Sequence, residues 1–188
     1  MKFVFILLFL VILFLLFPYF RIFVKRIILG TRIKNLCRRK EYMFFSAHAF
    51  PFLGRKNEKS CDFYIETEKE VLCVKLFAAK YKKSVLKFTT HQSRHYYFTN
   101  SIWLFSRWGQ TTMTYDSKMH PLPQYDFNVK FPQNAKLKTK TNILLIHPKC
   151  FEIVGVPSEG QKRILAVGDT VYGMRLESGK TFLESLRT

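Results

Sequence analysis

The N-terminal apolar run constrains this chain more than any other feature. Residues Phe3–Phe17 read FVFILLFLVILFLLF, which is fifteen apolar residues without a polar side chain. A helix needs about 20 mainly apolar residues to cross a bilayer core, and an extension through Pro18, Tyr19 and Phe20 reaches that length. Tyr19 suits a membrane interface because its ring is apolar and its hydroxyl is polar. The sequence therefore predicts a transmembrane anchor over residues 1–20.

Two other interpretations of this run fit less well. A cleaved signal peptide needs small residues just after the apolar stretch, and no Ala, Gly or Ser precedes Gly30. A buried core helix is the second alternative. It fits poorly because the run lies at the extreme terminus and a basic stretch follows it. We therefore expect a retained signal-anchor.

The charges around the run predict its orientation. Only Lys2 precedes it, whereas eight basic residues and no acidic residue follow it up to position 40: Arg21, Lys25, Arg26, Arg32, Lys34, Arg38, Arg39 and Lys40. Such a bias favours the cytoplasm for the C-terminal side of a span. The prediction is a single-pass membrane protein with a cytoplasmic C-terminal domain. Export of that domain is the alternative.

The net charge of +18 indicates the partners to expect. The first 40 residues contribute nine basic and no acidic side chains, and the other 148 contribute 22 basic and 13 acidic ones. Each Lys or Arg near an anionic lipid surface contributes about 1 kcal/mol. Residues 21–40 are therefore predicted to be a juxtamembrane segment that binds lipid headgroups of the bilayer through its eight cations. The remaining excess admits nucleic acid. The basic and aromatic side chains between Lys80 and Trp108 suggest a surface that faces either nucleic acid or lipid. Codon bias toward Lys and Phe explains the same excess without a partner.

The rest of the chain has a β-rich pattern. Cys61–Glu66 and Val71–Phe77 flank a polar turn and predict a β-hairpin. Residues 41–53 suit either a short helix or a strand, and further strands are expected at 84–90, 94–105, 142–147, 150–156, 163–167 and 170–176. The tail at 179–187 has helical spacing, with Ser178 or Thr181 as the cap. These patterns predict a small α+β domain over residues 41–188, with mostly antiparallel strands and a short C-terminal helix.

The cysteines and histidines have no metal-site spacing. Cys37, Cys61, Cys73 and Cys150 are widely separated, and the five histidines are scattered. A zinc site needs closely spaced pairs of ligands, so we predict neither a metal nor another cofactor. A cytoplasmic domain would keep the four thiols reduced.

One pair of residues carries a candidate catalytic chemistry. Asp62 lies at the start of the first hairpin strand and Lys75 lies on the second. This stretch, Asp62 to Lys75, resembles the core of the PD-(D/E)xK nuclease families. The resemblance implies that two acidic groups bind Mg²⁺ and that the Lys helps to activate water. The chain departs from the family pattern at the second acidic position, two before the Lys, where it has Cys73.

The leading prediction is therefore a membrane-anchored protein whose domain is a non-enzymatic binding or structural module. Its predicted binding residues are the eight cations between Arg21 and Lys40. The rival prediction is a degenerate or atypical nuclease-like domain with Asp62 and Lys75 as its catalytic residues. The sequence identifies no protein partner.

Overall fold

The computed structural model of the chain contains two helices and thirteen strands among its described residues. These residues are 2–46, 52, 61–77, 85–91, 94–100, 106–107, 110–111, 120–121, 138–150, 152–156 and 163–188. The elements are α1 (Lys2–Arg39), β1 (Met43–Phe45), β2 (Phe63–Glu66), β3 (Glu70–Phe77), β4 (Val85–His91), β5 (Arg94–Asn100), β6 (Ser106–Arg107), β7 (Gln110–Thr111), β8 (His120–Pro121), β9 (Thr139–Ile146), β10 (Glu152–Val156), β11 (Arg163–Ile164), β12 (Thr170–Val171), β13 (Met174–Ser178) and α2 (Gly179–Ser185).

The strands form two larger sheets and one small one. The first has six strands in the order β1-β2-β3-β9-β13-β12, the second has five in the order β11-β10-β4-β5-β8, and β6 pairs with β7. The sheets are mixed, because β3 and β13 run parallel to β9 and β10 runs parallel to β4. Parallel neighbours need long crossovers, and the segment between β3 and β9 is of that kind. The α+β class and the short C-terminal helix are confirmed. The sheets are mixed, and seven of the ten strand pairs among the described residues are antiparallel.

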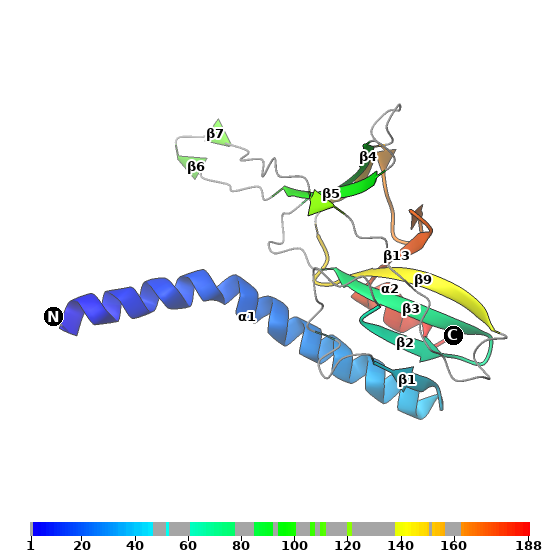
Figure 1. Ribbon diagram of the computed structural model, residues 1–188. Helices are drawn as coiled ribbons and strands as arrows, with labels where there is room; N and C mark the ends of the chain where they lie inside the picture. The colour runs from blue at the N-terminus through cyan, green and yellow to red at the C-terminus, as the bar shows by residue number, and fades with distance from the viewer. Residues whose placement is uncertain are drawn as a thin grey trace.

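The helices cover one face of the six-stranded sheet. Leu29 and Ile33 of α1 and Phe182 of α2 are buried against apolar side chains of β2, β3 and β9. The opposite face of the sheet, with Leu144 and Leu176, packs against the five-stranded sheet in a second core. Figure 1 shows the C-terminal half of α1 beside β1 and β2, and α2 behind β3 and β9. The main sheet therefore lies between a helical layer and a second sheet.

Helix α1 is one continuous element of 38 residues. Its N-terminal half extends beyond the sheets (Figure 1). Gly30 lies inside the helix and faces Phe52, where a Cβ atom would overlap the aromatic ring. The glycine therefore serves close packing.

No helix in the described part of the chain is long and apolar enough to cross a membrane. This finding corrects the predictions of a transmembrane anchor over residues 1–20, of a single-pass topology and of a signal-anchor. The uninterrupted apolar run has only fifteen residues, fewer than the roughly 20 that a span needs. Arg21, Lys25 and Arg26 follow it within the same helix. The cellular location of the domain stays a prediction.

The predicted hairpin is confirmed, and a second hairpin was missed. β2 pairs antiparallel with β3, with Phe63 opposite Val74. Residues 170–176, expected as one strand, instead form β12, a two-residue turn and β13. Tyr172 and Gly173 both have positive φ angles, of 50° and 75°. Positive φ at both central residues defines a tight hairpin turn. The sequence does not indicate this turn, because its first central residue is Tyr and not the usual Asn, Asp or Gly.

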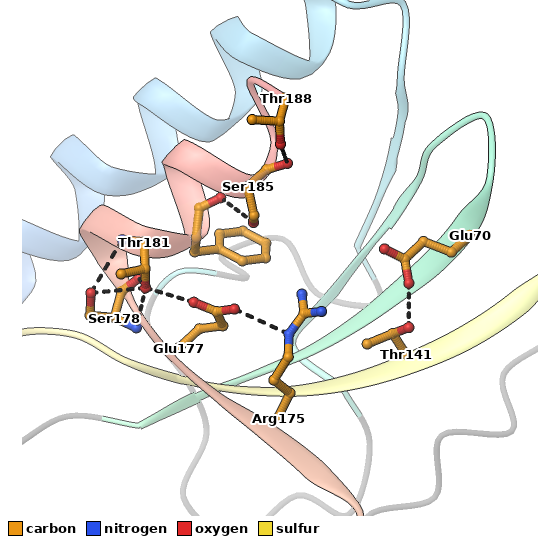
Figure 2. A network of polar contacts seen from close by, with 9 residues as sticks. Glu70, Thr141, Arg175, Glu177, Ser178, Thr181, Ser185 and Thr188 are labelled. Atoms are coloured by element: carbon orange, nitrogen blue, oxygen red, sulfur yellow. Dashed lines mark hydrogen bonds and ion pairs between the residues drawn. The ribbon is translucent and has the colours of Figure 1, made fainter. Parts of the chain in front are cut away.

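The C-terminal helix α2 begins with a capping box, as Figure 2 shows. The Ser178 hydroxyl accepts a hydrogen bond from the Thr181 amide at 3.2 Å, and the Thr181 hydroxyl accepts one from the Ser178 amide at 3.0 Å. Thr181 also donates to Glu177 at 2.6 Å, and Glu177 forms an ion pair with Arg175 at 3.1 Å. Both residues predicted as caps therefore take part, with Ser178 as the N-cap.

Candidate functional site

The structure brings the predicted pair Asp62 and Lys75 together in a buried place. The Lys75 Nζ lies 3.3 Å from one Asp62 carboxylate oxygen, and the backbone amide of Leu76 donates to the other at 2.7 Å. The Asp62 side chain is 1% exposed and the Lys75 side chain is 2% exposed. Each carboxylate oxygen therefore already accepts a bond from β3. The pair ties the start of β2 to its neighbouring strand.

Cys73 occupies the place of the second acid in the resemblance to PD-(D/E)xK nucleases. It is fully buried beside Cys61, and the two thiols form a hydrogen bond. This bond lowers the pKa of Cys73, whereas the bond and burial together raise the pKa of Cys61. Mg²⁺ prefers oxygen ligands, and this place offers a sulfur and a carboxylate whose two oxygens are engaged. The residues therefore do not fit the metal that the resemblance implies.

Two further carboxylates of the hairpin, Glu66 and Glu70, also have protein partners. Glu66 pairs with Lys138 at 2.8 Å, and Glu70 accepts a hydrogen bond from the Thr141 hydroxyl (Figure 2). Across the described residues, no three His, Cys, Asp or Glu side chains gather closely enough to hold a metal ion.

The eight predicted membrane-surface cations, seven on α1 and Lys40 just after it, differ in their surroundings. Arg26 is buried, and its Nε donates to the His147 carbonyl at 3.4 Å. Burial lowers the pKa of Arg26, and the nearby Asp62 carboxylate opposes that shift. Lys34 lies over the rings of Phe44 and Phe52, with its Nζ 5.6 and 5.7 Å from their centroids.

The remaining predicted cations are Lys25, Arg32, Arg38, Arg39 and Lys40, which are exposed, and Arg21, which is half-buried. Three of them, Lys25, Arg32 and Arg39, line a groove that the sequence analysis did not predict. The predicted set is therefore divided between the protein core, an aromatic contact and this groove.

The groove lies between α1 and α2 and consists of two adjoining cavities. The larger, of about 450 Å³, is lined by Lys25, Arg32, Lys180, Arg187 and other residues, and the smaller, of about 280 Å³, is lined by Arg32, Arg39 and Arg187 among others. The two cavities share Arg32, Leu183 and Arg187. We call this surface the basic groove. Its signal in the sequence is weak, because its two walls are about 150 residues apart.

The basic groove has a strong excess of positive charge. Its lining contains five cations, Lys25, Arg32, Arg39, Lys180 and Arg187, and one carboxylate, Glu184. Glu184 lies 3.9 Å from Lys180. Within the described residues, the other four cations have no ion-pair partner. Guanidinium groups bind planar oxyanions through paired hydrogen bonds, so this arrangement suits a ligand with several negative charges.

His147 forms part of the wall at one end of the groove. Its Nε2 lies 3.3 Å from the Lys25 carbonyl oxygen, which fixes the ring against α1. A Cβ atom at Gly179 would lie 2.5 Å from the His147 Nδ1, so only glycine permits this approach of α2. Burial lowers the pKa of His147, and the positive charges of Arg26 and Lys25 lower it further. The backbone hydrogen bond to Lys25 acts in the opposite direction. Burial and the two positive charges therefore favour the neutral form of the ring.

The predicted basic and aromatic surface between Lys80 and Trp108 lies partly outside the described residues. Lys82, Lys83, Trp103 and Trp108 are all outside them, while Lys87 is half-buried in β4. This surface stays a prediction.

Comparison with protein-family models, with curated proteins and with solved structures found no match to this chain.

Proposed function

We propose that this protein is a non-catalytic binding module that holds an anionic ligand in the basic groove. The observation that carries the proposal is the lining of the groove, where five cations face one carboxylate. Four of these cations lack an ion-pair partner among the described residues. Like charges held close together repel each other, and an anion relieves that repulsion.

A nuclease-like activity is the second candidate. It is favoured by the position of Asp62 and Lys75, whose side chains meet at 3.3 Å on the two strands that the resemblance implies. Two features weigh against it. Both Asp62 oxygens accept hydrogen bonds from β3, and Cys73 replaces the second acid. We therefore assign the pair a structural role.

The first experiment measures binding of inorganic polyphosphate to the full chain by calorimetry. A double variant, Arg32→Ala with Arg187→Ala, removes two groove cations. A matched control, Arg38→Ala with Lys40→Ala, removes two exposed cations that do not line the groove. We expect the groove variant to lose most of the affinity and the control to keep it. Equal losses in the two variants would mean that net charge alone attracts the anion.

A second assay tests the nuclease alternative. The full chain is incubated with plasmid DNA and Mg²⁺, beside a Lys75→Met variant. We expect no cleavage above background from either protein. Cleavage that requires Mg²⁺ and disappears in Lys75→Met would replace the binding-module proposal with the nuclease one.

A further inference from the structure

We infer that the ligand of the basic groove is the backbone of a single nucleic-acid strand, lying lengthwise between α1 and α2. This inference depends on the proposed function and narrows it to one ligand class. Three features carry it: the regular spacing of the cations, the helical nature of both walls, and the position of the cations between two helices.

The cations of α1 are evenly spaced along the groove. Lys25, Arg32 and Arg39 are seven residues apart, which is almost two helical turns, so they stay on one side of the helix at intervals of about 10.5 Å. Lys180 lines the same cavity as Lys25, and Arg187 lines the same cavity as Arg39. The positive charge therefore continues along the groove for about 21 Å. A ligand that uses all of it must be long and must carry charge along its length.

The walls favour phosphate over a peptide backbone. The two walls come mainly from helices, whose backbone groups already bond within the helix, so no strand edge is available to pair with a peptide. Three of the five cations are Arg residues, and their guanidinium groups match the oxygens of a phosphodiester. A polyanion with a charge on every unit meets this surface better than a peptide with scattered acidic side chains.

The position of the cations favours one strand over a duplex. A DNA major groove about 12 Å wide admits one helix, and one helix with its side chains already has a diameter of about 10–12 Å. Here Arg32 and Arg187 lie in a recess between two packed helices. A single flexible backbone reaches such a recess, whereas a duplex meets the outer surface of both helices.

The lining also predicts binding without sequence preference. The side chains between the cations are Ile28, Leu29, Leu36, Leu183 and Asn35, with His147 at one end. Neither Phe, Tyr nor Trp appears among these described lining residues, so stacking on aromatic rings, which holds bases in many single-strand sites, is not available here. Phosphate contacts alone do not read bases.

The test uses labelled oligothymidylates about three, six and twelve nucleotides long, with fluorescence anisotropy of the full chain as the readout. A groove of about 21 Å holds about six nucleotides at 3.4 Å each. We expect affinity to rise steeply up to about six nucleotides and only slightly beyond. Oligoadenylates of equal length should bind within about twofold, because the contacts are to phosphate.

Salt and a matched pair of variants locate the contacts. If the four cations without an ion-pair partner all contact phosphates, the affinity of the native protein for the oligonucleotide should fall about 50-fold between 50 and 200 mM salt. The affinity of Arg32→Ala, which makes one contact fewer, should fall about 18-fold over the same range. Arg32→Ala should weaken binding about fivefold at 0.1 M salt, whereas Arg38→Ala, which removes an exposed cation outside the groove, should change it less than twofold.

Several outcomes would overturn the inference while leaving the proposed function intact. One such outcome is that polyphosphate binds in the groove while the affinity for oligonucleotides does not depend on their length. A second such outcome is that a duplex, polyglutamate or anionic lipid vesicles bind more tightly than the single strand and that Arg32→Ala weakens this binding. The groove would then be assigned to that ligand. Failure to bind polyphosphate as well would remove both the inference and the proposed function.

Discussion

The Asp62→Asn substitution tests whether the Asp62–Lys75 pair is structural. Asn keeps an oxygen that can accept the bond from the Leu76 amide, which lies at 2.7 Å in the native protein. It removes the charge opposite Lys75, whose side chain is 2% exposed. The variant therefore removes the Asp62 negative charge from beside a buried ammonium group. We expect a large loss of unfolding free energy from this single atom exchange.

The size of the loss follows from the geometry. Two unit charges 3.3 Å apart attract each other by about 5 kcal/mol at an effective dielectric constant of about 20. Breaking a buried pair typically costs about 3–5 kcal/mol. Lys75→Met in the same chain removes the buried positive charge, so the double variant Asp62→Asn with Lys75→Met should recover most of the loss. The coupling energy between the two sites should be about 3 kcal/mol or more.

Urea unfolding followed by far-ultraviolet circular dichroism measures these values. Asp169→Asn is a matched control, because the Asp169 carboxylate also accepts a backbone bond, from Ala166 at 2.9 Å. Its ion-pair partner Arg163 lies at 3.9 Å and is 74% exposed, so this substitution should cost less than about 1 kcal/mol. The structural role is refuted if Asp62→Asn costs no more than Asp169→Asn, or if the double variant recovers nothing.

Three further predictions concern packing and pH. Gly30→Ala should lower the free energy of unfolding measured in urea by about 1–3 kcal/mol, because the added methyl group overlaps the Phe52 ring and this strain exceeds the gain in helix propensity. A higher free energy of unfolding would contradict the close contact. Gly179→Ala should displace the His147 ring and lower the melting temperature; an unchanged ring resonance in NMR spectra would contradict this. Burial lowers the folded-state pKa of His147 below the ordinary histidine value of about 6.5, so the unfolded chain binds the proton more readily. Its contribution to stability is present above about pH 6.5 and is lost as the pH falls through the lowered value. His147→Asn should therefore flatten the decline in unfolding free energy between about pH 7 and 5, and an equal decline in both proteins would contradict the assignment.

Local patterns predicted those elements whose signals lie within a short stretch. The β2–β3 hairpin follows from two apolar runs around a polar turn, and Ser178 and Thr181 predict the start of α2 from four residues of sequence. The β12–β13 turn was missed because Tyr172 adopts a positive φ of 50°, which is uncommon for a bulky residue.

The candidate site depends on contacts that no local pattern contains. In the sequence, eight cations form one group after the apolar run, but the helix directs Arg26 into the core and Lys34 toward two rings. The groove appears only when α2 packs beside α1 and brings Arg187 close to Arg32. Asp62 and Lys75 were paired correctly, because the hairpin that joins them is local. Their burial, which decides the role of the pair, comes from the whole domain.

The shared use of α1 by the core and the groove restricts how this protein can change. Ile33 is fully buried, while its neighbour Arg32 lines the groove. One inserted residue would rotate everything after it by about 100°, so that Ile33 would leave the core and Arg39 would leave the groove together. Related chains should therefore differ in this part of the helix by substitution, while insertions and deletions accumulate in the connections between strands.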